Sequence, residues 1–177
     1  MTDAPDYIDP VEGWRVWAVV DDGGRTLLRS LFYDVLWEPG VPACARCEHR
    51  QFSLRTPWRR RRTGHAAPEE HCRCGIHAAF RPGTLMPYFR LRAPGEYCRA
   101  IGRVALWGEI VECESGYRAQ RAYPTQLFLP DLLRVPSRPH APVAVESLAL
   151  ELVEYDVPVE ILAREAERAV LPVLPAL

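Results

Sequence analysis

The sequence predicts an α+β fold that is mainly antiparallel β, a partly closed small barrel or sandwich with a metal-binding loop insertion and C-terminal helices. Three observations support this fold class. Several stretches alternate apolar and polar residues between turn signals. Four of the six cysteines and four of the five histidines gather in residues 41–83, which show no regular periodicity. Apolar residues recur at helical spacing near the C-terminus.

The first 40 residues predict an acidic arm followed by a β-hairpin. Residues 1–12 carry four acidic residues and two prolines, which is typical of a loosely ordered arm. Residues 13–20 and 25–32 have strand patterns on either side of the turn signal DDGG (21–24). Residues 34–40 predict a third short strand that ends at a Pro-Gly pair.

Strand patterns resume after the cysteine-rich loop, in which we expect only a short element around residues 75–80. The longer stretches with a strand pattern are 84–92, 101–113 and 116–130. Gly108 and Pro124 interrupt two of these stretches and predict a bulge or an edge strand there. We therefore expect five to seven antiparallel strands.

The C-terminal part predicts helices. Residues 144–156 and 159–171 show apolar spacing of three and four residues, and Val157-Pro158 separates them. These helices are expected to pack on the β domain. The predicted organisation is an acidic arm (1–12), a β domain (13–135) that contains the metal-binding insertion (41–83), and a helical segment (143–172).

Composition excludes membrane-spanning and secreted proteins. The chain has 177 residues, of which 48% are hydrophobic and 25% charged, as in globular domains. It has no apolar run near the ~20 residues of a membrane helix, and its acidic N-terminus does not resemble a secretion signal. We therefore expect a cytoplasmic protein. All 22 basic residues are arginine and asparagine is absent, which is typical of a GC-rich bacterial genome.

The cysteines and histidines form two groups with metal-ligand spacing. They read C-A-R-C-E-H at 44–49 and H-A-A-P-E-E-H-C-R-C-G-I-H-A at 65–78. Thiolate and imidazole groups are preferred ligands of Zn²⁺ and of iron–sulfur clusters. Gly75 would let the backbone turn beside the sulfur atoms. Spacing alone favours a ligand set made only of cysteines: Cys44, Cys47, Cys72 and Cys74.

A second ligand set follows from a resemblance. The blocks that carry it are A-R-C (45–47), H-A-A-P (65–68), C-R-C-G-I-H-A (72–78), A-L-W-G-E-I (105–110) and G-Y-R-A-Q-R-A-Y-P (116–124). They resemble a group of small uncharacterised proteins from high-GC Gram-positive bacteria, over most of the chain between Trp14 and Pro124. The resemblance brings no activity. It implies Cys47, His65, Cys72 and Cys74 as ligands, with Cys44 as the substitute fourth ligand.

The two remaining cysteines, Cys98 and Cys113, stand alone on predicted strands and are expected to be ordinary buried residues. The metal is zinc or a [2Fe–2S] cluster, since each takes four such ligands. A site filled by four protein ligands leaves no position open for a substrate. We therefore expect a non-enzymatic zinc-stabilised binding or adaptor module, with a small [2Fe–2S] redox or sensor protein as the alternative.

Two regions are candidates for binding a partner, which we expect to be a protein. Residues 46–62 hold seven arginines and one glutamate, a charge that suits an acidic surface or, as a weaker alternative, nucleic acid. The second region is a strand rich in tyrosine and arginine. The candidate residues are Trp58, Arg59, Arg60, Arg61, Arg62, Tyr117, Arg118, Arg121 and Tyr123.

Overall fold

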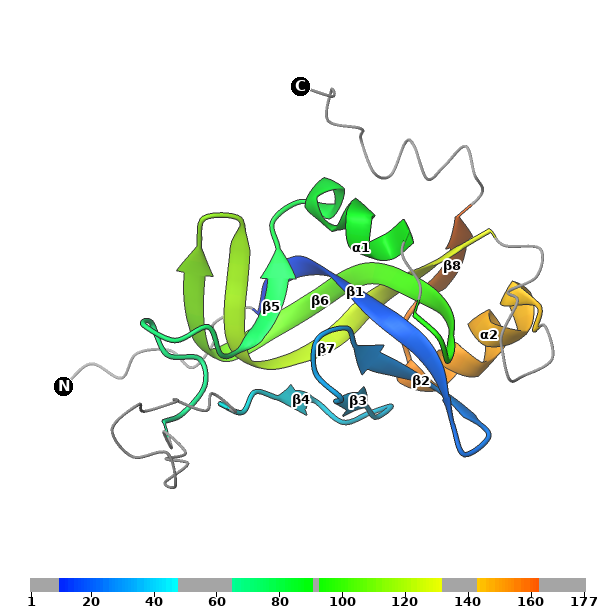
Figure 1. Ribbon diagram of the computed structural model, residues 1–177, viewed down its shortest axis with the longest axis horizontal. Coiled ribbons are helices and arrows are strands. Elements are labelled where there is room, and N and C mark those ends of the chain that lie inside the picture. The colour runs from blue at the N-terminus through cyan, green and yellow to red at the C-terminus, as the bar shows by residue number, and fades with distance from the viewer. Residues whose placement is uncertain (1–9, 48–64, 91–92, 132–142, 163–177) are drawn as a thin grey trace.

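One large curved sheet dominates the computed structural model, which describes residues 10–47, 65–90, 93–131 and 143–162 (Figure 1). Its strands are β1 (Val11–Asp22), β2 (Arg25–Ser30), β3 (Leu36–Trp37), β4 (Ala43–Cys44), β5 (Ile76–Ala79), β6 (Glu96–Cys113), β7 (Gly116–Pro130) and β8 (Val159–Leu162). The helical elements are η1 (Pro82–Leu85), α1 (Met86–Arg90), α2 (Val145–Leu152) and η2 (Val153–Tyr155). The predicted mainly antiparallel β class is confirmed.

Four strands curl the sheet into a partial ring. β1 pairs with β6, β6 with β7, and β7 with β5, which returns to β1. Because Trp14 and Ala79 are the only pair registered between β5 and β1, the sheet is ring-like without being a barrel. β2 and β3 extend the sheet beyond β1, whereas β4 and β8 pair with β7.

The opening hairpin and the third short strand are confirmed as β1, β2 and β3. At the turn, the backbone N–H of Gly24 donates to a carboxylate oxygen of Asp21 at 2.7 Å. β1 begins at Val11, so the last two residues of the predicted acidic arm belong to the sheet. Residues 1–9 of that arm lie outside the described part of the chain.

Two bulges bend the long β6–β7 hairpin, and both occur where the sequence predicted an irregularity. The register shifts between Trp107 and Ile110, around Gly108, and again between Arg103 and Val104, where Pro124 is the partner of Val104. Each shift inserts extra residues into one strand, which increases local twist. The hairpin therefore curves far enough to take part in the ring.

The core is centred on two fully buried tryptophans. The rings of Trp17 and Trp37 meet edge to face at 5.5 Å. Tyr155 of η2 anchors this pair, because its hydroxyl donates to the Trp37 carbonyl and accepts the N–H of Leu28 at 2.9 Å. A buried hydroxyl that both donates and accepts carries no desolvation penalty for a missing partner. These two tryptophans are therefore core residues.

The C-terminal elements confirm one predicted helix and correct the other. α2 and η2 form where a helix was predicted, and α2 buries Val145, Leu148 and Leu152 against the core. Residues 159–162 are a strand, β8, parallel to β7. The helical path ends at Asp156, whose φ is 55°, and at Pro158. Residues 159–162 pair instead with the free edge of β7, because its backbone hydrogen-bonding groups outweigh the local apolar spacing. Residues 163–171 lie outside the described part.

Residues 84–90 form helical turns, so the strand predicted over 84–92 is wrong in the part that the structure describes. Pro82 opens η1 at a position where a missing N–H costs nothing, and Pro87 could not donate to a sheet. The apolar residues of this stretch still face the protein, since Phe89 is buried against β6 and β7. Among the described residues, no helix is long and apolar enough to cross a membrane.

Glu96, at the start of β6, is a buried carboxylate with three partners. It accepts hydrogen bonds from Arg99 Nε at 3.0 Å and from the Ala93 N–H at 2.9 Å, and pairs with Arg29 at 3.7 Å. Only 4% of its side chain is exposed. We expect Glu96→Ala to lower the free energy of unfolding by about 3 kcal/mol, because it leaves buried donors unpaired.

Urea denaturation measures this loss, with Glu12→Ala as the matched control. Glu12 also pairs with an arginine, Arg103 at 2.6 Å, but 45% of its side chain is exposed. Exposed ion pairs contribute at most about 1 kcal/mol. Equal losses in the two variants would contradict a role for burial.

Candidate metal centre

The topology of β7 brings two distant segments of the chain together. β6 pairs with β7 along one edge, so β5 and β4 share the other edge at successive positions, opposite residues 116–119 and 121–122. The backbone N–H of Ala45 continues this pairing by donating to the Gln120 carbonyl at 2.8 Å. Cys47, just after β4, therefore lies beside the loop of residues 65–75 that leads into β5.

Four side chains converge at this place. The Sγ atoms of Cys47 and Cys72 are 3.8 Å apart, and His65 Nε2 lies 3.3 Å from Cys74 Sγ. The four possible ligand atoms all lie within 4.8 Å of one another. Cys74 is buried, whereas the other three side chains are half-buried. The group is compatible with the binding of a metal ion.

The converging group is the one implied by the resemblance, and the set favoured by spacing alone differs from it in one residue. Cys44 lies within β4, is exposed, and directs its thiol toward the Pro42 carbonyl at 3.7 Å. Cys44 pairs with Arg121 in the sheet and is not a member of the converging group. Cys98 is 1% exposed in the hydrophobic core, as predicted for an ordinary buried cysteine.

The thiols of Cys72 and Cys74 differ in acidity because their surroundings differ. The backbone N–H of Cys74, and then the neighbouring side chains of the group, lower the pKa of Cys72 to about 7. Burial, together with the nearby Cys72 side chain, raises the pKa of Cys74 to about 11. A thiolate is the form that binds metals. Of these two thiols, that of Cys72 is therefore the more readily converted to the thiolate at neutral pH.

Gly75 allows the tight turn between Cys74 and β5. Its φ is +120°, a conformation that side chains rarely adopt. A Cβ atom there would lie 3.0 Å from the Cβ of Arg118 and 3.1 Å from that of Pro68. The glycine that the sequence predicted as a turn residue is thus required both by its backbone conformation and by close packing.

We expect Gly75→Ala to destabilise the protein by about 2 kcal/mol or more, because strain and a steric clash add. Urea denaturation measures the effect. Gly40→Ala is the matched control, since Gly40 also has a positive φ (+72°) but has nothing within 4 Å of its added Cβ. An equal loss at both positions would show that backbone strain alone matters.

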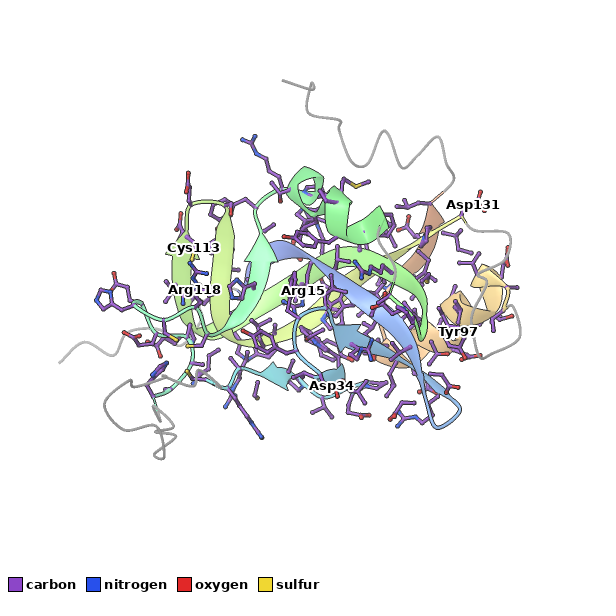
Figure 2. The ribbon with its side chains drawn as sticks, viewed as in Figure 1. Arg15, Asp34, Tyr97, Cys113, Arg118 and Asp131 are labelled. Carbon is purple, nitrogen blue, oxygen red and sulfur yellow. The ribbon has the colours of Figure 1, made fainter. Side chains whose placement is uncertain are left out.

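Arg118 of β7 supports the loop of residues 65–75 through hydrogen bonds to its backbone. It is 7% exposed, and its guanidinium donates to the backbone carbonyls of Glu69, Glu70, Cys72 and Cys74. Its Nε also lies 3.3 Å from the Cys113 sulfur. Figure 2 shows Arg118 and Cys113 together near the turn that joins β6 and β7. One side chain therefore ties the loop that carries Cys72 and Cys74 to the sheet.

Arg118 thus has a structural role that the sequence did not suggest, while its binding of a partner stays a prediction. An arginine on a strand usually extends into solvent, and only the pairing of Arg118 with His77 across β5 and β7 places it under the loop. Local sequence carries no signal for that pairing. The sequence therefore did not reveal that Arg118 supports the loop that carries Cys72 and Cys74.

The other predicted partner-binding residues have different surroundings. Arg121 is exposed. Tyr117 is half-buried with its ring edge-on to Phe80 at 4.8 Å, and the Tyr123 hydroxyl accepts the Gly40 N–H and donates to the Tyr155 carbonyl. Their binding role stays a prediction. The arginine-loop residues lie outside the described part of the chain: Trp58, Arg59, Arg60, Arg61 and Arg62.

Comparisons with known proteins add no relative to this picture. No protein-family model matches the chain, and no curated protein or solved structure matches it either.

Proposed function

We propose that this protein is a non-enzymatic binding or adaptor module stabilised by one Zn²⁺ ion, held by Cys47, His65, Cys72 and Cys74. The observation that carries the proposal is the convergence of their four ligand atoms within 4.8 Å of one another. The residues come from two segments separated by 17 residues in the chain (48–64), so sequence proximity alone does not account for their meeting.

The distances support a single ion. A tetrahedral zinc site with Zn–S bonds of about 2.3 Å places two sulfur ligands about 3.8 Å apart. The Cys47 and Cys72 sulfur atoms are 3.8 Å apart. In a [2Fe–2S] cluster the ligands divide between two irons, so ligand atoms on opposite irons must lie farther apart than those that share one ion. The compact group therefore favours zinc over the cluster.

The ligand set supports a structural role. Four protein ligands complete the tetrahedron, whereas catalytic zinc sites keep a position open for water or substrate. Three thiolates and one neutral imidazole give a zinc site a net charge of −1, and Arg118 supplies a positive charge directly behind the loop. Metal binding would contribute folding free energy to a loop that has few core residues of its own.

The zinc ion would also fix both ends of the arginine-rich segment. Cys47 precedes residues 48–64 and His65 follows them, so the metal would clamp this segment at its base. The proposed partner is therefore an acidic protein surface bound by Arg59, Arg60, Arg61 and Arg62. Nucleic acid is the weaker alternative, and its affinity would fall steeply as salt increases.

Metal analysis with an absorption spectrum, on protein purified without oxygen, tests the choice of metal. We expect about one zinc ion per chain and no visible absorbance. About two irons with matching sulfide and a brown colour would replace the zinc module by the redox or sensor protein. No bound metal of either kind would overturn both.

A further inference from the structure

A cavity of about 520 Å³ is lined by residues of β1, β5 and the η1–α1 segment. Small-molecule sites have volumes of about 300–1,000 Å³, so this cavity is large enough for a ligand. It has no part in the proposed zinc site, although Arg73 and Gly75 of the loop of residues 65–75 line one wall.

The charged side chains that line the cavity are all positive. Arg15, Arg73 and Arg118 line it, and the described lining residues include no aspartate or glutamate. Within the described part of the chain, none of these arginines forms an ion pair with a carboxylate. Hydroxyl groups add further donors, from Tyr33, Thr84, Tyr88, Ser115 and Tyr117. The cavity is thus rich in donors and lacks a negative charge.

Of the three arginines, Arg15 is the one for which the absence of a negatively charged partner is most unfavourable. It is half-buried within β1 (Figure 2). Its two terminal nitrogens donate to the His77 carbonyl and to Ser30 Oγ. Its Nε is buried and has no acceptor among the described residues. Burial lowers the pKa of Arg15 to about 10, so the group is still charged at neutral pH. The guanidinium lies over the Trp37 ring, 5.2 Å from its centroid, and has no carboxylate partner among the described residues.

The positive charges of the cavity also affect His77. Its Nε2 donates to the Arg73 carbonyl at 3.0 Å. Burial lowers the pKa of His77, and the charges of Arg15 and Arg118 lower it further. The two arginines therefore act on a neighbouring group that lines the same cavity, and the described lining residues include no aspartate or glutamate.

Aromatic side chains surround the mouth of the cavity. Phe32, Tyr33 and Tyr88 line it and yet are 75%, 52% and 41% exposed. The rings of Phe32 and Tyr88 meet edge to face at 5.5 Å. Large exposed aromatic groups at a concave site are typical of ligand binding, because they bury apolar area when a planar molecule covers them.

We propose that this cavity binds a small organic oxyanion, a carboxylate or a phosphate attached to a planar apolar body. The oxyanion accepts hydrogen bonds from Arg15 and Arg73, since guanidinium groups match the geometry of both anions. The planar body packs against Phe32 and Tyr88. Binding supplies the negative charge that the cavity lacks.

Calorimetric titration of the metal-loaded protein with four aromatic probes tests the proposal. Benzoate and phenyl phosphate carry the two oxyanions, benzamide is neutral and benzylamine is a cation. We expect at least one anion to bind at millimolar concentration. The neutral and cationic probes are expected to bind at least about tenfold more weakly, because they lose a charged hydrogen bond. The stronger of the two anions identifies the oxyanion preferred. Equal binding of benzamide, or no binding of either anion, would overturn the proposal.

Variants then locate the binding. Arg73→Gln is expected to lower the affinity for the preferred anion about tenfold. Arg15→Gln is expected to lower this affinity at least as much. Because Arg15 also supports Ser30 and His77, Arg73→Gln keeps the test decisive if the other variant fails to fold. Arg25→Gln is the matched control, an exposed arginine of β2 that does not line the cavity. Zinc content is measured for each variant, and an unchanged affinity in Arg73→Gln with full zinc content would overturn the assignment.

Discussion

Cys72→Ser is expected to reduce bound zinc from about one ion per chain to nearly none and to loosen residues 65–75. A serine hydroxyl remains protonated at neutral pH and cannot replace the thiolate that zinc requires. Structural zinc binding contributes about 10–16 kcal/mol in small domains, so its loss removes most of what holds this loop. Metal analysis measures the first effect, and amide hydrogen exchange of the loop measures the second.

Two other cysteines serve as controls for this variant. Cys98→Ala changes a cysteine buried in the core, and Cys44→Ser changes the exposed cysteine of β4. Both variants are expected to keep about one zinc ion per chain. Loss of zinc from Cys44→Ser would support the all-cysteine ligand set that spacing favours. Loss of zinc from Cys98→Ala would contradict the ligand assignment.

Arg118→Ala is expected to weaken zinc binding by about 10- to 100-fold, the usual effect of removing a group that positions metal ligands. The substitution leaves the carbonyls of Cys72 and Cys74 without their donor and removes the positive charge behind the thiolates. Buried groups left unpaired also lower the free energy of unfolding, by about 3 kcal/mol or more. Competition with a zinc chelator and urea denaturation measure the two effects.

Arg121→Ala is the matched control for Arg118→Ala. Arg121 lies on the same strand but is exposed, so its loss should change neither zinc affinity nor stability by much. Arg118→Lys is expected to recover only part of the affinity, because one ammonium group cannot reach carbonyls on several sides. Similar zinc affinities for Arg118→Ala and Arg121→Ala would show that Arg118 does not position the loop.

Local sequence predicted the elements whose signals are local. The glycines after Asp22 marked the first hairpin, and Gly108 and Pro124 marked the two bulges of the long hairpin. The prediction failed where partners distant in the chain decided the structure. Residues 159–162 have helical spacing, yet they complete the free edge of β7, and no local pattern reveals that edge.

The candidate site shows the same division. The density of cysteine and histidine indicated a metal site, and Gly75 indicated its turn. Spacing alone favoured Cys44 as the fourth member, whereas the group that converges contains His65, because β4 lies along β7. The role of Arg118 depends on the register between β5 and β7, which fixes its guanidinium under the loop. Each of these facts requires the sheet to be assembled first.

X-ray absorption at the zinc edge, measured on the zinc-loaded protein, tests the central claim most directly. We expect four ligands, with three sulfur atoms at about 2.3 Å and one nitrogen at about 2.0 Å. His65→Ala should lose the nitrogen contribution. A site of four sulfur atoms would contradict the account and place Cys44 at the metal. A shell with a bound water oxygen in place of a protein ligand would contradict the structural role of the zinc ion.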